Sequence, residues 1–524
     1  MAMAPLNGCP LPTTSTTGPP HLLPSSASIS AFIASDPALT LLHTRCVSMA
    51  HLRQLHAALV KSGLAKDPIA ASRAVAFCAG PGRDVLYAER LVRHHPRPNS
   101  FMWNTVIRAL SDGARPDAAV ALFVDMLSSP TPPDRRSFPS LLAAYARLGR
   151  AGDGEALHGM ALKLGLAGDA YVRNATIAMY ASCGRADEAL ALFGQCPELD
   201  VVACNSVIVA LARAGRVDEA RSVFDAMPER TVATWSAMVS AYARAARCSE
   251  ALALFSAMQA DGMEPNANVL VSVLGCCASL GALVQGAWVH EYIDRHGVAM
   301  NALVVTALVD MYCKCGSVDD ARQVFDAARS QGLAKLSSWN SMMQGLAVHG
   351  QWREAVALFS ELKSYGLSPD NVTFIAVLTA YGHSGMPDEA QAAFASMSSE
   401  HGVEPGIEHY GCLVDALARA GRLREAEDAI RAMPMAPDAA IWGALLSGCR
   451  LHGDAELGAR AAREAVRCDP RDSGAYVLAA SVLARGGDPG RGAGIRGRMR
   501  EAGVGKVPGS SMIEVNGVVH EFVS

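Results

Sequence analysis

Apolar side chains recur along most of this chain at the spacing of one helix face, in short stretches that come in pairs. In residues 100–134, Trp103 and Val106 belong to a first apolar stripe, Gly113 interrupts the chain, and Phe123 belongs to a second stripe. Each stripe covers only a few helical turns. The pattern therefore predicts two short helices joined by a turn.

The paired pattern is repeated along the chain. The stretch "ARAGRVDEARSVFDAMPER" at 212–230 returns in similar form as "ARAGRLREAEDAIRAMP" at 418–434. Copies aligned on the residue after the aromatic position of the first helix lie 31 to 36 residues apart. The aligned residues are Asn104, Pro139, Asn174, Asn205, Ser236, Val271, Thr306, Asn340, Ile375 and Gly411.

A helical hairpin of this size cannot bury its apolar stripes alone, so each unit has to stack on its neighbours. The sequence therefore predicts an all-α fold, a right-handed superhelical α-solenoid of helix-turn-helix repeats. We expect its helices to run from about residue 33 to residue 506.

The residues of these units resemble the pentatricopeptide repeat family. First helices open with an aromatic residue and asparagine, as in "MWNTVI" at 102, and second helices follow "G-R-x-D-E-A-x-x-x-F-x-x-M". The alternation of 35-residue and 31-residue units is similar to the plant subclass built of standard, long and short motifs. On this resemblance, residues 33–438 form about eleven repeats of alternating type.

The resemblance continues beyond the repeats. Residues 408–464 look like a last short repeat followed by the first extension motif of the subclass, and 509–522 look like the end of the second. Extension motifs are accordingly expected over 439–506 and a C-terminal tail over 507–524. The glycine-rich stretch at 485–506 departs from a good helical pattern, which predicts an imperfect second extension motif.

The resemblance implies a sequence-specific reader of single-stranded RNA, in which each unit addresses one base through its fifth and its last residue. Amide and hydroxyl side chains suit this task because they match the donors and acceptors of base edges. Carried over to this sequence, the predicted base-reading residues are Ser72, Asn99, Asn104, Asp134, Asn174, Asp200, Asn205, Ser236, Asn266, Thr306, Asn340 and Asp370.

Helix capping is the alternative role for the same residues. Asn, Ser and Thr are common at helix starts, and Asp just before a helix suits the positive end of its dipole. The long units, however, have Pro139, Val271 and Ile375 at the fifth position, where the other units mostly have Asn, Ser or Thr. Capping alone predicts no such segregation by unit type.

By the family's rules the units from residue 68 onward imply a target near 5′-A-U-n-U-Y-A-n-R-U-n-n-3′. Lys335 and Thr231 fit these rules poorly, which leaves Y and R loosely defined. The second residue of each unit is expected to clamp the bases by apolar contact, as Phe101, Tyr171 and Val202 could. Arg136, Asn268 and Ser337 at the same position argue against such a clamp in their units.

Charge and cysteine content limit the possible functions. The net charge is −4, so nucleic-acid binding has to rely on placed side chains rather than on a basic surface. The fourteen cysteines are scattered without zinc-ribbon spacing, which indicates buried free thiols in a reducing compartment. No metal and no cofactor are expected.

Residues 1–32 hold no Asp, Glu, Lys or Arg and are rich in Ser, Thr, Pro and Ala. This composition resembles an organelle transit peptide, and the missing arginine favours a plastid over a mitochondrion; a disordered tail is the alternative. The stretch contains no apolar run long enough for a membrane span.

The sequence does not predict an enzyme. Some relatives append a cytidine deaminase, which needs H-x-E followed by P-C-x-x-C, and neither string occurs here. The extension motifs therefore imply a site-recognition factor for C-to-U editing that recruits a separate deaminase. The edited cytidine would lie about four nucleotides 3′ of the base at the last repeat, a rule of the family. Small organelle editing cofactors are the other expected partners, and the RNA-bound protein is expected to be a monomer.

Two other functions stay open. The array could act by occupancy alone, stabilising RNA or aiding splicing, although the extension motifs argue against this. Alternatively, its concave surface could bind a peptide, which the slightly acidic charge favours.

Overall fold

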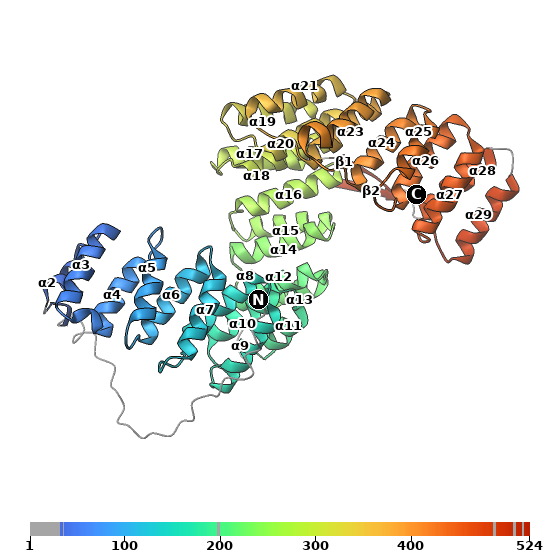
Figure 1. Cartoon of the computed structure of the whole chain (residues 1–524). Helices are drawn as coiled ribbons and strands as arrows, with labels where there is room; N and C mark the ends of the chain where they lie inside the picture. Colours follow the sequence, from blue (N-terminus) through green and yellow to red (C-terminus); the bar gives the residue numbers. More distant parts are fainter. Residues whose placement is uncertain are drawn as a thin grey trace. The chain divides into compact units, whose positions relative to one another are not determined.

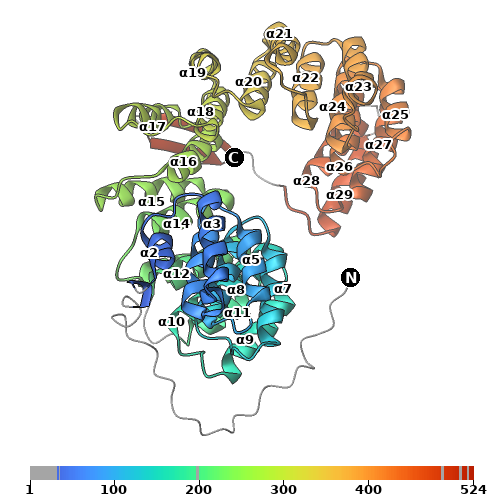
Figure 2. The ribbon, with the colours of Figure 1, turned by 60° about the vertical axis from the view of Figure 1, so that its left-hand side comes forward.

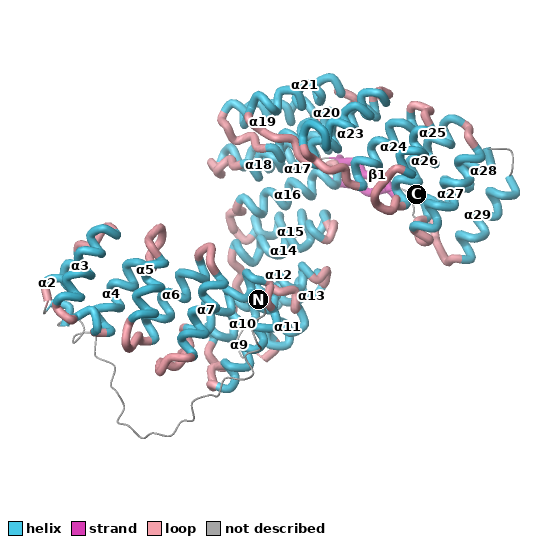
Figure 3. The backbone as a smooth tube through the Cα atoms, in the orientation of Figure 1, coloured by secondary structure: helices cyan, strands magenta, loops and turns pink. Residues whose placement is uncertain are grey.

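The computed structural model describes residues 32–34, 36–195, 200–485, 489–506, 510–515 and 518–523. The predicted targeting segment lies, up to residue 31, outside the described residues. The described chain consists of helices in hairpin pairs and one two-stranded sheet near the C-terminal end (Figure 1 and Figure 3). It divides into two compact units, Met1–Ala241 and Tyr242–Ser524.

The first unit contains hairpins that end in the helix α14, which contains the unit boundary. Its elements are α2 (Pro37–Thr44), α3 (Met49–Lys61), η2 (Leu64–Lys66), α4 (Pro68–Cys78), α5 (Val85–His94), α6 (Ser100–Asp112), α7 (Pro116–Leu127), α8 (Ser137–Leu148), α9 (Ala151–Lys163), α10 (Ala170–Ser182), α11 (Ala186–Phe193), α12 (Val201–Arg213), α13 (Val217–Ala226) and α14 (Val232–Arg244).

The second unit continues the series, and its helices follow one another in sequence order (Figure 2). Its elements are α15 (Cys248–Ala260), α16 (Ala267–Leu280), α17 (Leu283–Arg295), α18 (Ala302–Lys314), α19 (Val318–Ser330), α20 (Leu336–Val348), α21 (Trp352–Leu362), η3 (Lys363–Tyr365), α22 (Asn371–His383), α23 (Pro387–His401), α24 (Ile407–Arg419), α25 (Leu423–Arg431), α26 (Ala439–His452), α27 (Ala455–Cys468), α28 (Ser473–Arg485), α29 (Pro489–Glu501), β1 (Ser510–Val515) and β2 (Val518–Val523).

Each first helix ends in a tight turn that reverses the chain. After α12, Gly215 has a left-handed backbone with φ of 76°, and the next N–H, of Arg216, donates to the carbonyl of Leu211 at 2.9 Å. Glycine suits this turn because it has no Cβ to oppose a positive φ. The turn places the second helix back against the first.

The repeated "ARAGR" sequence also sets the start of the second helix. Arg216 donates to Glu219 at 2.6 Å and pairs with Asp187 of the preceding second helix, and Arg422 donates to Glu425 at 2.6 Å in the same way. The hydrogen bond from Arg216 holds the pKa of the Glu219 carboxyl below its ordinary value. Such exposed pairs each contribute little stability, but they link neighbouring repeats along the outer layer.

The core lies between first helices, which pack against one another from repeat to repeat. In the first unit α6 packs on α8, α8 on α10 and α10 on α12, and the second unit repeats this from α16 through α18, α20, α22 and α24 to α26. Large side chains such as Phe138, Trp339 and Phe374 are fully buried in this layer. The predicted all-α solenoid of helix-turn-helix repeats is confirmed.

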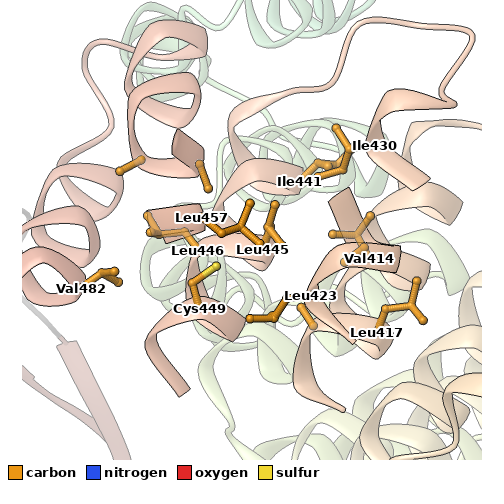
Figure 4. Packing of buried hydrophobic residues seen from close by; sticks show 14 of the residues in the cluster. Val414, Leu417, Leu423, Ile430, Ile441, Leu445, Leu446, Cys449, Leu457 and Val482 are labelled. Carbon is orange, nitrogen blue, oxygen red and sulfur yellow. The ribbon is translucent and has the colours of Figure 1, made fainter. Parts of the chain in front are cut away.

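The extension motifs continue the array without a break in its core. Leu417 of α24, Leu446 of α26, Leu457 of α27 and Val482 of α28 belong to one cluster of buried side chains (Figure 4). The last repeat therefore offers α26 the same kind of apolar surface that each repeat offers to the next.

The glycine-rich stretch departs from the expectation drawn from its sequence. A regular helix, α29, spans Pro489–Glu501, packs against α28 and buries Ile495 and Met499. A Cβ at Gly492 would lie 2.9 Å from the carbonyl oxygen of Ala480. Glycine thus allows two backbones to approach closely, and the packing offsets its poor helix propensity.

A β-hairpin follows the helices, which the sequence pattern did not predict. Strands β1 and β2 are antiparallel, with Ser510 opposite Val523. In the second unit the carboxylate of Glu514 accepts hydrogen bonds from the backbone N–H groups of Val284 at 2.8 Å and Gln285 at 3.3 Å, at the start of α17. Within the described part of the chain, no helix has both the length and the apolar character of a membrane span.

Candidate nucleic-acid interface

The fifth residue of each unit lies in the second turn of the first helix, directly beside the second residue. Asn104 of α6 follows Phe101 by three positions, and Asn174 of α10 follows Tyr171 by three positions. Residues three apart on a helix share one face. These two first helices therefore present an amide and, next to it, an exposed apolar side chain.

Three predicted Asn/Asp pairs are joined by hydrogen bonds in the structure. The amide Nδ2 of Asn104 donates to Oδ1 of Asp134 at 2.9 Å, and that of Asn174 donates to Asp200 at 2.9 Å. In the second unit Asn340 donates to Asp370 at 3.0 Å. The fifth and last residues of these units therefore form one polar site, although 26 to 30 residues separate them in sequence.

The first predicted pair, Ser72 and Asn99, is also connected. The amide of Asn99 donates to Oγ of Ser72 at 3.1 Å, and the Ser72 hydroxyl bonds the carbonyl oxygen of Pro68 at 2.5 Å. A hydroxyl thus replaces the amide as the side chain beside the last residue of this unit.

Other predicted pairs differ. Thr306 shares a hydrogen bond of 2.9 Å with Ser337, the second residue of the next unit, where the sequence pairs it with Lys335. The amide oxygen of Asn205 is buried without a hydrogen-bond partner.

Ser236 lies in the first unit and Asn266 in the second, so this pair spans two separately described bodies. Asn266 itself is exposed at the start of α16.

Capping explains the last residue of a unit but not the fifth. The carboxylates of Asp200 and Asp370 accept backbone N–H groups at the starts of α12 and α22, and Asn99 caps α6 in the same way. Asn104 and Asn340 lie inside their helices and cap neither. The amide at the fifth position is therefore not a helix cap, and its role in base reading stays a prediction.

Five second positions carry large exposed apolar side chains, whereas Arg136, Asn268 and Ser337 are polar at this place. Their exposed fractions are 48% for Phe101, 78% for Tyr171, 60% for Val202, 54% for Leu303 and 53% for Val372. Exposed apolar side chains that recur from unit to unit are typical of a binding surface. Flat bases could lie against them.

The long units lack a polar group at the fifth position. Pro139 of α8, Val271 of α16 and Ile375 of α22 are half-buried at this place. The series of polar fifth positions is therefore interrupted by an apolar residue in each long unit.

Sequence analysis missed two hydroxyl groups that lie beneath this surface and contact its amides. Oγ of Ser137 donates to Oδ1 of Asn104 at 2.7 Å, and Oγ1 of Thr373 lies 2.8 Å from Oδ1 of Asn340. Both are the third residue of the next unit and are fully buried. A Ser or Thr three positions after the pair's Asp is a signal in the sequence that could have indicated them.

The thiols of the described cysteines are free and carry no sign of reactivity. Burial raises the pKa of Cys78, of Cys277 and of Cys313 to about 12, so these groups stay protonated at neutral pH. Among the residues that the structure describes, no group of three or more His, Cys, Asp or Glu side chains could hold a metal ion.

Comparison with known proteins shows to which family this chain belongs. A family model described as "PPR repeat" matches seven stretches, which are residues 101–130, 171–201, 202–232, 233–263, 304–333, 372–401 and 408–436. A chloroplastic pentatricopeptide repeat-containing protein of Arabidopsis thaliana is 49% identical, over 96% of this chain and 89% of the relative. The chain belongs to the pentatricopeptide repeat family.

Further matches agree with this assignment. A model described as "PPR repeat family" covers residues 335–383, and one described as "E motif" covers residues 452–514, which fits the E-type pentatricopeptide repeat proteins. A mitochondrial pentatricopeptide repeat-containing protein of Arabidopsis thaliana is 34% identical, over 94% of this chain and 87% of the relative.

The crystal structure of the pentatricopeptide repeat protein PPR10 from maize aligns with 92% of this chain and 79% of its own, with a TM-score of 0.50 and 18% identity. At this identity the likeness shows the fold alone.

Proposed function

We propose that this pentatricopeptide repeat protein binds a single-stranded RNA of an organelle in a sequence-specific manner. The observation that carries the proposal is the hydrogen-bonded pair of Asn and Asp that recurs on first helices, at Asn104, Asn174 and Asn340. Each pair lies one helical turn from an exposed second residue. One base per repeat, contacted on its edge and its face, fits this periodic arrangement.

The chemistry of the pair suits a pyrimidine edge. Nδ2 of Asn104 carries two N–H groups, one of which donates to Asp134, so the other can donate to a carbonyl oxygen of uracil. Phe101 or Tyr171 can stack on a base at about 1–3 kcal/mol per contact, whatever the base is. In this scheme stacking supplies affinity and the amide supplies selectivity.

Specific side-chain contacts have to dominate because the chain has a net charge of −4. A protein that binds by neutralising many phosphates loses affinity steeply as salt rises. We therefore expect a shallow dependence of RNA affinity on salt concentration.

We further propose that the bound protein marks a cytidine for C-to-U editing and recruits a separate deaminase. The match to the E motif over residues 452–514 supports this, because the extension motifs are characteristic of editing factors in the family that the chain resembles. Helices α26 to α29 extend the array as further hairpins and offer a surface for such a partner. The organelle names of two relatives support a plastid or a mitochondrion, and the composition of residues 1–32 favours a plastid.

The binding proposal is tested with purified protein and a randomised RNA pool. Sequences retained by the wild type should contain uracil at the second and ninth positions of the predicted string, which face Asn104 and Asn340. Changing both residues to Ser should change the preferred base at these two positions and leave the others. An unchanged preference in the double variant contradicts base reading, and retention of peptides in place of RNA favours the scaffold alternative.

The editing proposal is tested in a loss-of-function plant line by sequencing plastid and mitochondrial RNA. Loss of editing at one or a few cytidines downstream of a matching sequence is the expected result. Altered transcript ends or splicing with intact editing would instead favour occupancy as the mode of action.

A further inference from the structure

The three Asn/Asp pairs are chemically identical in sequence, yet the structure gives them different surroundings. Asn104 is held at both ends of its amide: Nδ2 donates to Asp134 at 2.9 Å, and Oδ1 accepts from the Ser137 hydroxyl at 2.7 Å. Oγ of Ser137 also accepts the backbone N–H of Asp134 at 3.1 Å. These contacts form a closed network around the amide.

The same network surrounds Asn340 in the second unit. Nδ2 donates to Asp370 at 3.0 Å, and Oγ1 of Thr373 lies 2.8 Å from Oδ1. The backbone N–H of Asp370 donates to Oγ1 of Thr373 at 3.1 Å. Ser137 and Thr373 occupy the third position of their units and have no exposed surface, so neither can touch RNA directly.

Asn174 lacks this support. Its Nδ2 donates to Asp200 at 2.9 Å as in the other pairs, but the third residue of the next unit is Ala203. Oδ1 of Asn174 is consequently buried, and no described residue offers it a hydrogen bond. An unsatisfied buried acceptor is costly, and the hydrogen bond to Asp200 is the contact that holds this amide, at its nitrogen end only.

Asn205 shows that the hydroxyl acts only together with the Asp. Thr234 is present at the third position, but its hydroxyl lies 3.1 Å from Thr231, which replaces the Asp. Oδ1 of Asn205 again has no partner. A Ser or Thr therefore holds the amide where an Asp receives its nitrogen.

We propose that Ser137 and Thr373 are specificity-determining positioning residues, which fix the amides of Asn104 and Asn340 so that each presents N–H to uracil. With the oxygen bonded inward, the outward group is a donor. Without the hydroxyl, as at Asn174, the Asp alone holds the amide, so its outward N–H is oriented less firmly. Uracil is then preferred less strictly over bases whose edge offers an amino group.

This inference rests on the proposed RNA binding, and its test separates the two. Dissociation constants are measured by fluorescence anisotropy for RNAs that match the predicted string and differ at one position only. The wild type should prefer uracil more strictly at the second and ninth positions, facing Asn104 and Asn340, than at the fourth, facing Asn174. A wild type without any base preference contradicts the proposed function itself.

Variants then isolate the hydroxyl. Ser137→Ala should reduce the preference for uracil at the second position by about two- to tenfold, the range expected for one neutral hydrogen bond. Preference at the ninth position should stay unchanged in this variant. Thr373→Val should show the reverse pattern, and Ser137→Thr should retain the wild-type preference.

Ala203→Ser is the matching gain-of-function variant, because it places a hydroxyl beside the unpartnered oxygen of Asn174. Uracil preference at the fourth position should rise. If the Ser137 hydroxyl only capped a helix, Ser137→Ala would lower the thermal stability. It would also reduce the affinity equally for the RNAs with each of the four bases at the second position. Unchanged base ratios in Ser137→Ala, with wild-type uracil preference intact, would overturn the inference.

Discussion

The turn between α14 and α15 contains a residue that is poorly suited to it. Ala246 has φ of 57° and is the one non-glycine residue with a positive φ in the described part of the chain. The next N–H, of Arg247, donates to the carbonyl of Tyr242 at 3.0 Å, as Arg216 does to Leu211 in the turn of Gly215. The two turns therefore have the same hydrogen bond but a different residue in the left-handed position.

Replacing Ala246 with glycine should stabilise the protein. A left-handed conformation costs an L-residue roughly 1–2 kcal/mol. Glycine loses about 0.4–1 kcal/mol more conformational entropy than alanine on folding, which offsets part of this gain. We expect Ala246→Gly to raise the free energy of unfolding by about 0.5–1 kcal/mol, the difference between these two terms.

The measurement is urea denaturation followed by circular dichroism of the helices. Gly215→Ala is the matched control: a Cβ at Gly215 would meet no atom within 4 Å, so only the backbone conformation opposes it. This control should lower the stability by a similar amount. If Gly215→Ala destabilises while Ala246→Gly has no effect or destabilises, Ala246 is not held in a left-handed turn and the reasoning is wrong.

Two further predictions concern packing and protonation. Gly448→Ala should destabilise by about 1–3 kcal/mol through overpacking, because its Cβ would lie 2.6 Å from the Cβ of Ala418 and 2.8 Å from its carbonyl oxygen. Gly443→Ala on the same helix meets nothing within 4 Å and should be neutral or stabilising; equal melting temperatures for the two variants would contradict this account. Burial lowers the pKa of His158, which contacts the Tyr180 hydroxyl at 3.2 Å, below its ordinary value of 6.5. The unfolded chain then binds the proton more readily, so stability should fall as pH drops below about 6.5, and His158→Gln should reduce that slope in pH-dependent denaturation; an identical slope in the variant would rule the histidine out.

Local sequence rules located most of the candidate interface. The repeat spacing aligned Asn104, Asn174 and Asn340, the resemblance to the family paired each with its Asp, and the structure joins all three pairs. This succeeds because a helix of fixed rise places the fifth residue, and stacking of identical hairpins places the start of the next helix beside it. Their role in base reading remains a prediction.

Other contacts could not be predicted from the repeat pattern of the sequence. Thr306 bonds to Ser337 instead of to the last residue of its unit, and the tail of the chain forms a hairpin whose Glu514 reaches the start of α17. Both depend on which neighbours the packing brings within hydrogen-bond distance. No periodicity within one unit contains that information.

The sequence by itself determined the repeat length, the two helices of each unit and the row of polar fifth positions, because hydrophobic period and glycine turns act over a few residues. Only the tertiary structure decided which amides are held at both ends. Asn104 and Asn174 each pair with an Asp, but only the amide oxygen of Asn104 accepts a hydrogen bond from a hydroxyl. The third residue of the following unit makes this difference: it is Ser137 in one case and Ala203 in the other. Hydrogen bonds are satisfied in space, so a residue about thirty positions away can decide how an amide is oriented.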